Sequence, residues 1–155
     1  ESVKEASFAR PVLLVFLRHF GCVFCKEGLH DIAELREQID QQADLIFVHM
    51  ANNDIAEQYF KEFNLQGVKH VSNPSKNYYA SMGLMKGTVS QLYGLRTWIR
   101  GFSPKNQGFK LELAEHLGDS TQMPGMFLVK EGNIVNSFVH KRASQRPDYL
   151  SFLKS

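Results

Sequence analysis

Two cysteines, Cys22 and Cys25, are separated by Val23 and Phe24, and the chain contains no other cysteine. If Cys22 opens a helix, Cys25 lies one turn further on, on the same face of that helix. The unpaired N–H groups at a helix N-terminus carry about half a positive charge, which stabilises a thiolate at Cys22. Such a pair closes an intramolecular disulfide, with Cys22 as the exposed nucleophile and Cys25 as the more buried thiol that resolves its adducts.

Two other interpretations of the cysteine pair stay open. One is a structural zinc site, which needs four ligands and for which His19 and His30 are the candidate imidazoles. The other is ordinary packing of both cysteines in the core. Redox chemistry is favoured, because a Cys-x-x-Cys that follows a buried strand and opens a helix is the sequence context of thioredoxin-like redox sites. We therefore expect neither a metal nor a cofactor.

The elements around the cysteines predict an α/β fold. Residues 12–17 form a short β-branched and aromatic run, which predicts a strand buried on both faces. Helical periodicity follows over residues 22–42, then a second strand at 45–48 and a second helix at 55–63. This order of strand, helix, strand and helix predicts a parallel sheet with right-handed crossovers.

The remaining residues predict further elements and one exposed loop. In chain order these are a strand at 68–72, a helix at 75–82, a helix at 88–102, a loop at 103–108, strands at 126–129 and 134–140, and a helix at 147–153. The last two strands form an antiparallel hairpin, because Glu131, Gly132 and Asn133 supply a turn of the three- to five-residue type.

Length and composition limit the class of protein. A chain of 155 residues predicts a single domain, and 43% hydrophobic residues exclude a disordered chain. The longest apolar run, residues 12–17, is far shorter than the about 20 residues that span a bilayer. A net charge of +2 gives no argument for nucleic-acid or membrane partners. The chain opens at Glu1 without a signal-peptide pattern, so we expect a cytoplasmic protein.

Three stretches of the chain resemble the peroxiredoxin-like branch of the alkyl hydroperoxide reductase/thiol-specific antioxidant superfamily. They are residues 18–25 with the cysteine pair, residues 118–128 with Met123, Pro124 and Gly125, and residues 140–147. Some relatives in that branch are prostamide/prostaglandin F synthases, which reduce an endoperoxide bond through a comparable cysteine pair. The resemblance implies one thioredoxin-like domain over residues 1–155, a central mixed sheet flanked by helices, with a helical insertion at about 65–121 before the cis-proline strand.

The resemblance also implies roles for residues around the cysteines. In thioredoxin-like folds a cis-proline packs beside the cysteine pair, and Pro124, with Met123 before it, matches that position. Typical peroxiredoxins carry Thr or Ser where this chain has His19, and an arginine where it has Pro124. We therefore expect His19 to tune Cys22 and another arginine to supply the missing cation. The candidates are Arg18, Arg96, Arg100 and Arg142.

The resemblance implies a thiol-dependent redox enzyme, a peroxiredoxin-like antioxidant that reduces hydroperoxides through Cys22 and Cys25. A thioredoxin-type protein disulfide oxidoreductase and a non-catalytic redox-sensing or binding module are the alternatives. In either catalytic form, an external thiol reductant such as a thioredoxin-like protein or glutathione resets the pair. We expect the protein to work as a monomer or a homodimer.

Overall fold

The computed structural model describes residues 2–84, 122–142 and 144–154. The helix expected at 88–102, the loop expected at 103–108 and much of the expected insertion lie outside these residues. The described elements, in chain order, are α1 (Val3–Ala9), β1 (Val12–Phe16), α2 (Val23–Asp40), β2 (Asp44–His49), α3 (Asn53–Glu62), β3 (Lys69–Ser72), α4 (Asn77–Ser81), β4 (Gly125–Lys130), β5 (Asn133–Val139) and α7 (Tyr149–Phe152).

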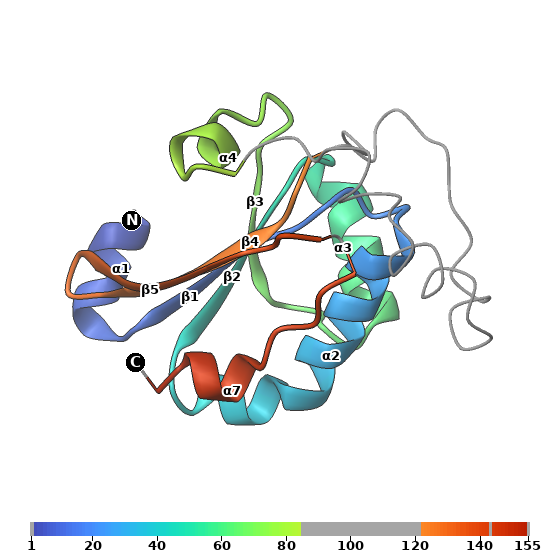
Figure 1. The fold of residues 1–155 in the computed structure, drawn as a ribbon. Helices are drawn as coiled ribbons and strands as arrows, with labels where there is room; N and C mark the ends of the chain where they lie inside the picture. The colour runs from blue at the N-terminus through green and yellow to red at the C-terminus, as the bar shows by residue number, and fades with distance from the viewer. Residues whose placement is uncertain (1, 85–121, 143, 155) are drawn as a thin grey trace.

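A five-stranded sheet in the order β3-β2-β1-β4-β5 runs through the middle of the fold (Figure 1). Strand β1 pairs in parallel with β2, and β2 in parallel with β3. Strand β4 is antiparallel to both β1 and β5. The expected mixed sheet is therefore confirmed, and β1, whose five residues are all buried, lies at its centre.

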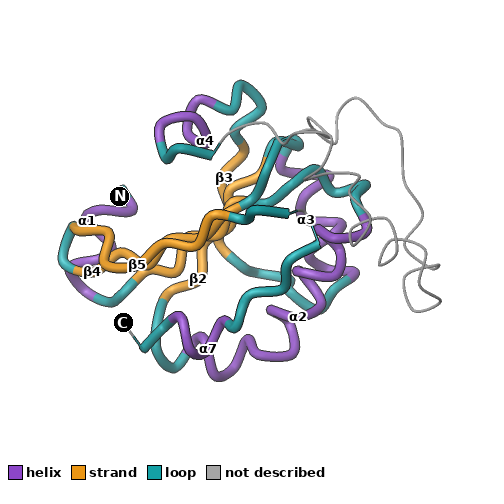
Figure 2. Tube along the Cα trace, viewed as in Figure 1, coloured by secondary structure: helices purple, strands orange, loops and turns teal. Residues whose placement is uncertain are grey.

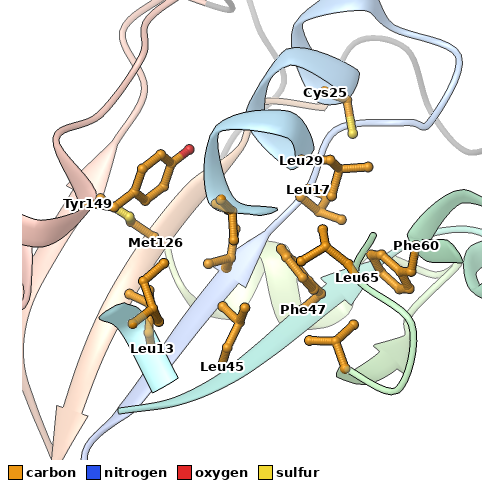
Figure 3. Packing of buried hydrophobic residues seen from close by; sticks show 14 of the residues in the cluster. Leu13, Leu17, Cys25, Leu29, Leu45, Phe47, Phe60, Leu65, Met126 and Tyr149 are labelled. Carbon is orange, nitrogen blue, oxygen red and sulfur yellow. The ribbon is translucent and has the colours of Figure 1, made fainter. Parts of the chain in front are cut away.

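Helices cover both faces of the sheet (Figure 2). On one face, Leu13 and Val15 of β1 pack beneath α2, α3 and α7, in a cluster that Figure 3 shows from close by. On the other face, Leu14 and Phe16 belong to a second cluster with residues of α1 and α4. Alternation of side chains along a strand explains why one short apolar run supplies both cores. The expected burial of this strand on both faces is confirmed.

Two local features differ from the expectations. Helix α1 was not expected, although Ser2 and Glu5 form a capping box at its start. The hairpin between β4 and β5 is tighter than the predicted three- to five-residue turn, because Lys130 pairs directly with Asn133. Its two linking residues, Glu131 and Gly132, both have positive φ, as a two-residue hairpin turn of the primed type requires.

Gly125, the first residue of β4, allows Leu84 and the backbone of β5 to approach this strand closely. A Cβ at this position would lie 2.6 Å from Leu84 Cδ2 and 3.1 Å from the Phe138 carbonyl oxygen. We expect Gly125→Ala to lower the free energy of unfolding by about 1–3 kcal/mol through overpacking. The measurement is urea unfolding, compared with Gly28→Ala, where the nearest atom is the Tyr149 hydroxyl at 3.8 Å.

In the Gly28→Ala control, alanine replaces a glycine inside helix α2 without a clash, so we expect stabilisation by roughly 0.5–1 kcal/mol. Equal stability of Gly125→Ala and the unmodified protein would show that Leu84 and the strand yield freely, and that the close approach has no structural consequence.

Two histidines from neighbouring strands are in contact: His49, the last residue of β2, and His70, the second residue of β3. The Nε2 atom of His49, which is fully buried, lies 2.9 Å from Nδ1 of His70. The Nε2 atom of His70 lies 3.5 Å from a carboxylate oxygen of Glu57 on α3. Burial, reinforced by His70, lowers the pKa of His49 to about 4. The folded protein therefore holds His49 as a neutral imidazole at pH values where the unfolded chain protonates it.

This pair makes the stability depend on pH. Between pH 6.5 and about 4 the unfolded chain binds a proton at His49 that the folded chain does not, so the free energy of unfolding falls as the pH falls. A shift of this size corresponds to roughly 3 kcal/mol. We expect His49→Gln to reduce, by the share that His49 contributes, the dependence of the urea midpoint on pH in this window. An unchanged slope of the urea midpoint against pH in the variant would show that groups other than His49 cause the pH dependence of the stability.

Candidate redox site

Cys22 lies where the chain leaves the sheet and enters a helix. Strand β1 ends at Phe16, and Cys22 is the N-cap residue of α2 with an extended backbone. Its amide donates to the His19 carbonyl at 3.1 Å, and its own carbonyl accepts from the Lys26 amide at 3.2 Å. The structure therefore places Cys22 at the strand-to-helix turn, as the sequence predicts, next to the N–H groups of the first helical turn.

The side chain of Arg18 contacts the Cys22 thiol directly. Its Nη1 donates to Cys22 Sγ at 2.5 Å, and its Nε donates to the Gln122 carbonyl at 3.3 Å. Arg18 is 7% exposed, so its guanidinium acts on the sulfur with little screening by water. Of the four candidate arginines, Arg96 and Arg100 lie outside the described residues. The backbone amide of Arg142 donates to Gln145 at 3.1 Å.

Cys25 lies one helical turn beyond Cys22 and faces the end of β1. Its Sγ donates to the Arg18 carbonyl at 3.5 Å. Burial, reinforced by the nearby Cys22, raises the pKa of Cys25 well above its usual range, and the charges of Arg18 and Lys26 only partly oppose this effect. Cys25 is therefore a protonated thiol at neutral pH. Both cysteines are free in the structure.

The expected exposure of Cys22 is wrong in this structure. Both cysteines are 6% exposed and both belong to the larger hydrophobic cluster, together with Phe20. The physical reason is that the Arg18 guanidinium contacts the Cys22 sulfur and that Cys22 is part of the hydrophobic cluster. Cys22 and Cys25 differ in their electrostatic surroundings, and they have the same exposed fraction.

The other three predicted site residues lie around the same turn. The Nδ1 atom of His19 accepts from the Gly21 amide at 2.9 Å, so His19 orders the turn that leads to Cys22. Met123 is buried and packs against Phe24, which lies between the two cysteines in the sequence. Pro124 lines a cavity that Cys25 also lines.

The expected cis-proline is wrong. No peptide bond within the described residues is cis, so the bond between Met123 and Pro124 is trans. The trans isomer is the ordinary preference for a bond before proline, by about 0.5–1 kcal/mol. Here it is compatible with the sheet, since the Pro124 carbonyl accepts from the His140 amide at 3.3 Å just before β4 begins.

Gln122 is a site residue that the sequence did not indicate. It is 3% exposed, and its Nε2 donates to the Leu84 carbonyl at 3.0 Å and to the Met123 carbonyl at 3.2 Å. Its backbone carbonyl accepts from Arg18, which lies 104 positions earlier in the chain. No local spacing reveals such a contact, because it depends on β4 pairing with β1.

A cavity of about 40 Å³ lies behind Cys25, between α2 and the segment that follows β5. Figure 3 shows Cys25 and Leu29 on α2, and the Tyr149 hydroxyl directed toward the same helix. The polar residues that line the cavity are Arg18, Cys25, Glu27, Asp31, His140, Gln145, Arg146 and Tyr149. Most of them could not be associated with the cysteines from the sequence, since residues 18–31 and 140–149 lie far apart in the chain.

Ionic contacts hold the wall of this cavity together. Arg146 donates to both carboxylate oxygens of Asp31, at 2.5 and 3.0 Å, and its Nε lies 3.6 Å from Glu27. Burial, reinforced by Asp31, raises the pKa of Tyr149 well above its usual range, so its hydroxyl remains protonated. The resulting wall ties the C-terminal segment to α2 beside Cys25.

Two further findings concern the described residues only. No group of three or more His, Cys, Asp or Glu side chains among them is arranged to hold a metal ion. Within the same residues, no helix has the length and apolar character needed to cross a membrane.

Comparisons with known proteins agree with this geometry. No protein-family model matches the chain. Peroxiredoxin-like 2C of Mus musculus is 27% identical over 142 residues, which are 85% of this chain and 61% of that protein. Peroxiredoxin 6 of Arenicola marina has a TM-score of 0.66 at 10% identity, over 99% of this chain and 62% of that one. Reduced Prx3 from Vibrio vulnificus, solved with H2O2, has a TM-score of 0.59 at 12% identity, over 94% of this chain and 76% of that one.

The solved structures share the fold of this chain, and the curated relative is similar to it in sequence over 85% of its length. The chain spans 61% of the length of that relative. The sheet order, the Cys-x-x-Cys at the start of α2 and the similarity to these proteins lead to one conclusion. The chain has a thioredoxin-like fold and is similar in sequence to peroxiredoxin-like proteins.

Proposed function

We propose that the protein is a thiol peroxidase, in which Cys22 attacks a hydroperoxide and Cys25 resolves the product. The contact between Arg18 Nη1 and Cys22 Sγ carries this proposal. A guanidinium on the sulfur favours the thiolate, which is the nucleophilic form, and the same cation can polarise the peroxide as negative charge develops on its oxygen. Arg18 in this way supplies the charge that typical peroxiredoxins take from the position of Pro124.

The proposed reaction has two steps. In the first, the Cys22 thiolate attacks the terminal peroxide oxygen, the O–O bond breaks, and the alkoxide leaves and takes up a proton to become an alcohol. Cys22 is then a sulfenic acid. In the second, the sulfur of Cys25 attacks Cys22, water leaves, and a disulfide joins the two residues. An external dithiol returns both cysteines to thiols.

The similar proteins support the substrate class. The relatives carry the name peroxiredoxin-like, and Prx3 of Vibrio vulnificus was solved in complex with H2O2. The short helical spacing supports the second step, because residues three apart in a helix are neighbours on its surface. An external thiol reductant completes the proposed cycle.

Disulfide exchange is the second candidate, and one observation favours it. Pro124 takes the place of the peroxiredoxin arginine and lines the same cavity as Cys25. In this route Cys22 attacks a disulfide of another molecule and Cys25 releases the mixed disulfide. The two functions differ at one intermediate, since only the peroxidase leaves a sulfenic acid on Cys22.

The test is a rapid-mixing experiment with the reduced Cys25→Ser variant and one equivalent of a hydroperoxide. We expect stoichiometric labelling of Cys22 by a sulfenic-acid probe such as dimedone, and an intramolecular disulfide in the unmodified protein. The matched control is the Cys22→Ser variant, which is expected to remain unlabelled. Oxidation of Cys22 no faster than free cysteine, without a trapped sulfenic acid, would leave disulfide exchange or redox sensing as the function.

A further inference from the structure

The buried thiol of Cys25 raises a chemical requirement. Its pKa is raised well above the usual range by burial, yet it must lose its proton when it forms a bond to Cys22. The groups that line the cavity behind it are therefore the candidates for accepting that proton. Tyr149 is a protonated hydroxyl, and the carboxylates of Glu27 and Asp31 face Arg146 at 3.6 and 2.5 Å.

His140 is the imidazole among the groups that line this cavity. It follows the last residue of β5, lines the same cavity as Cys25, and is held by its amide, which donates to the Pro124 carbonyl at 3.3 Å. Its Nδ1 is buried and has no hydrogen-bond partner among the described residues. Burial lowers the pKa of His140 to about 4, reinforced by Arg18 and opposed by the backbone of Pro124 and Gln145. At neutral pH the imidazole is uncharged and has one nitrogen that accepts a proton.

The size of the cavity suits a small mediator. A volume of about 40 Å³ exceeds the roughly 10–15 Å³ that one water molecule requires, and the lining supplies several polar atoms. We propose that His140 accepts the proton of Cys25, through a water molecule held in this cavity, as Cys25 forms its disulfide with Cys22. This inference rests on the roles of the two cysteines in the proposed function.

The step balances without a further reactant. The electron pair of the Cys25 sulfur forms the S–S bond, and the bond from Cys22 to its leaving group breaks, with its electron pair departing on that group. The Cys25 proton passes through the water to His140 Nδ1. In the peroxidase route, the leaving hydroxide takes this proton and becomes water. In the exchange route, the leaving thiolate departs and the proton reaches solvent.

The experiment uses the full chain in reduced form and an aromatic disulfide, dithiobis(nitrobenzoate), so that no peroxide chemistry is needed. Attack by Cys22 releases one coloured thiolate, and closure by Cys25 releases the second. For His140→Asn and His140→Gln we expect a first phase within about twofold of the unmodified protein. We expect a second phase slower by about tenfold to a hundredfold, a loss in the range of general-base catalysis.

The pH profile separates a proton acceptor from a packing residue. In the unmodified protein the closure rate is expected to stay level from neutral pH down to the pKa of His140 near 4, and to fall below it. In the His140 variants it is expected to rise about tenfold per pH unit, because hydroxide takes the place of the imidazole. Added imidazole should speed closure in His140→Ala, in which the cavity is enlarged.

Two variants serve as controls. His30→Asn removes a histidine whose side chain is 56% exposed, and both phases are expected to match the unmodified protein. Glu27→Gln tests a carboxylate of the cavity wall as the rival base. The inference is overturned if closure keeps its rate in both His140 variants, if both phases slow by the same factor, or if only Glu27→Gln slows closure. The proposed peroxidase function can fail independently, when Cys22 forms no sulfenic acid with a hydroperoxide.

Discussion

Replacing Cys22 by serine is expected to lower peroxide reduction by more than about a thousandfold, because a hydroxyl is not ionised at neutral pH and is a far weaker nucleophile than a thiolate. The fold should remain, since the side chains have similar volume and Cys22 makes its cap contacts through its backbone. The measurement is the steady-state consumption of hydroperoxide with an excess of a dithiol reductant. Residual activity within about tenfold of the unmodified protein would contradict Cys22 as the nucleophile.

The Cys25→Ser variant is the matched control for this prediction. It keeps the Arg18 guanidinium on Cys22, so the first turnover with peroxide should proceed at close to the normal rate. Turnover should then depend on whether the external thiol attacks the sulfenic acid directly. Loss of the first turnover in Cys25→Ser as well would show that the two cysteines act together in the attack on peroxide.

Replacing Arg18 by methionine has the second largest expected effect. The variant removes the charge and the hydrogen bond from Nη1 to Cys22 Sγ, and methionine keeps much of the buried side-chain volume. Hydrogen bonds to charged groups contribute roughly 1.5–3 kcal/mol, which corresponds to a factor of about 10–150. We expect the rate of Cys22 alkylation by iodoacetamide near neutral pH, in the Cys25→Ser background, to decrease by a factor in this range.

Two further variants test the geometry of this contact. Arg18→Lys keeps a charge but cannot donate to both Cys22 and the Gln122 carbonyl in the same way, so an intermediate rate is expected. Arg10→Met removes an exposed arginine that pairs with Asp44 at the far end of the sheet, and it should leave the alkylation rate unchanged. An alkylation rate in Arg18→Met equal to that in Arg10→Met would contradict the assignment of Arg18 as the group that activates Cys22.

Much of the fold was predictable because its signals are local. The apolar run of β1, the helical periodicity of α2 and the next strand and helix each report a preference that neighbouring residues enforce. The predicted ends of these elements differ from the observed ends by a few residues at most. The helix expected at 55–63, for example, is α3, which spans Asn53–Glu62 with Asn52 as its cap. The length of the β4–β5 turn was not predictable, because it follows from Lys130 pairing with Asn133 across the hairpin.

Helix α1 was not predicted from the sequence for a different reason. Its seven residues are too few to be stable alone, and they are held by packing of Val3 and Ala6 on the second face of the sheet. The capping box at Ser2 was present in the sequence, but without knowledge of that packing it carried little weight. The isomer of the bond before Pro124 was also not predictable from the residues themselves. The expectation of a cis bond came from family resemblance, and the bond is trans.

The sequence by itself determined which residues are the candidates for thiol chemistry and where in the chain they lie. Two cysteines three residues apart, after a buried strand and at the start of a helix, specify a thiol site through local backbone geometry alone. The tertiary structure decided which groups surround those thiols. Pairing of β1 with β4 brings Gln122 to Arg18, and packing of the C-terminal segment on α2 brings His140 to the cavity of Cys25. Burial and charge depend on contacts between distant residues, and such contacts exist only in the folded chain.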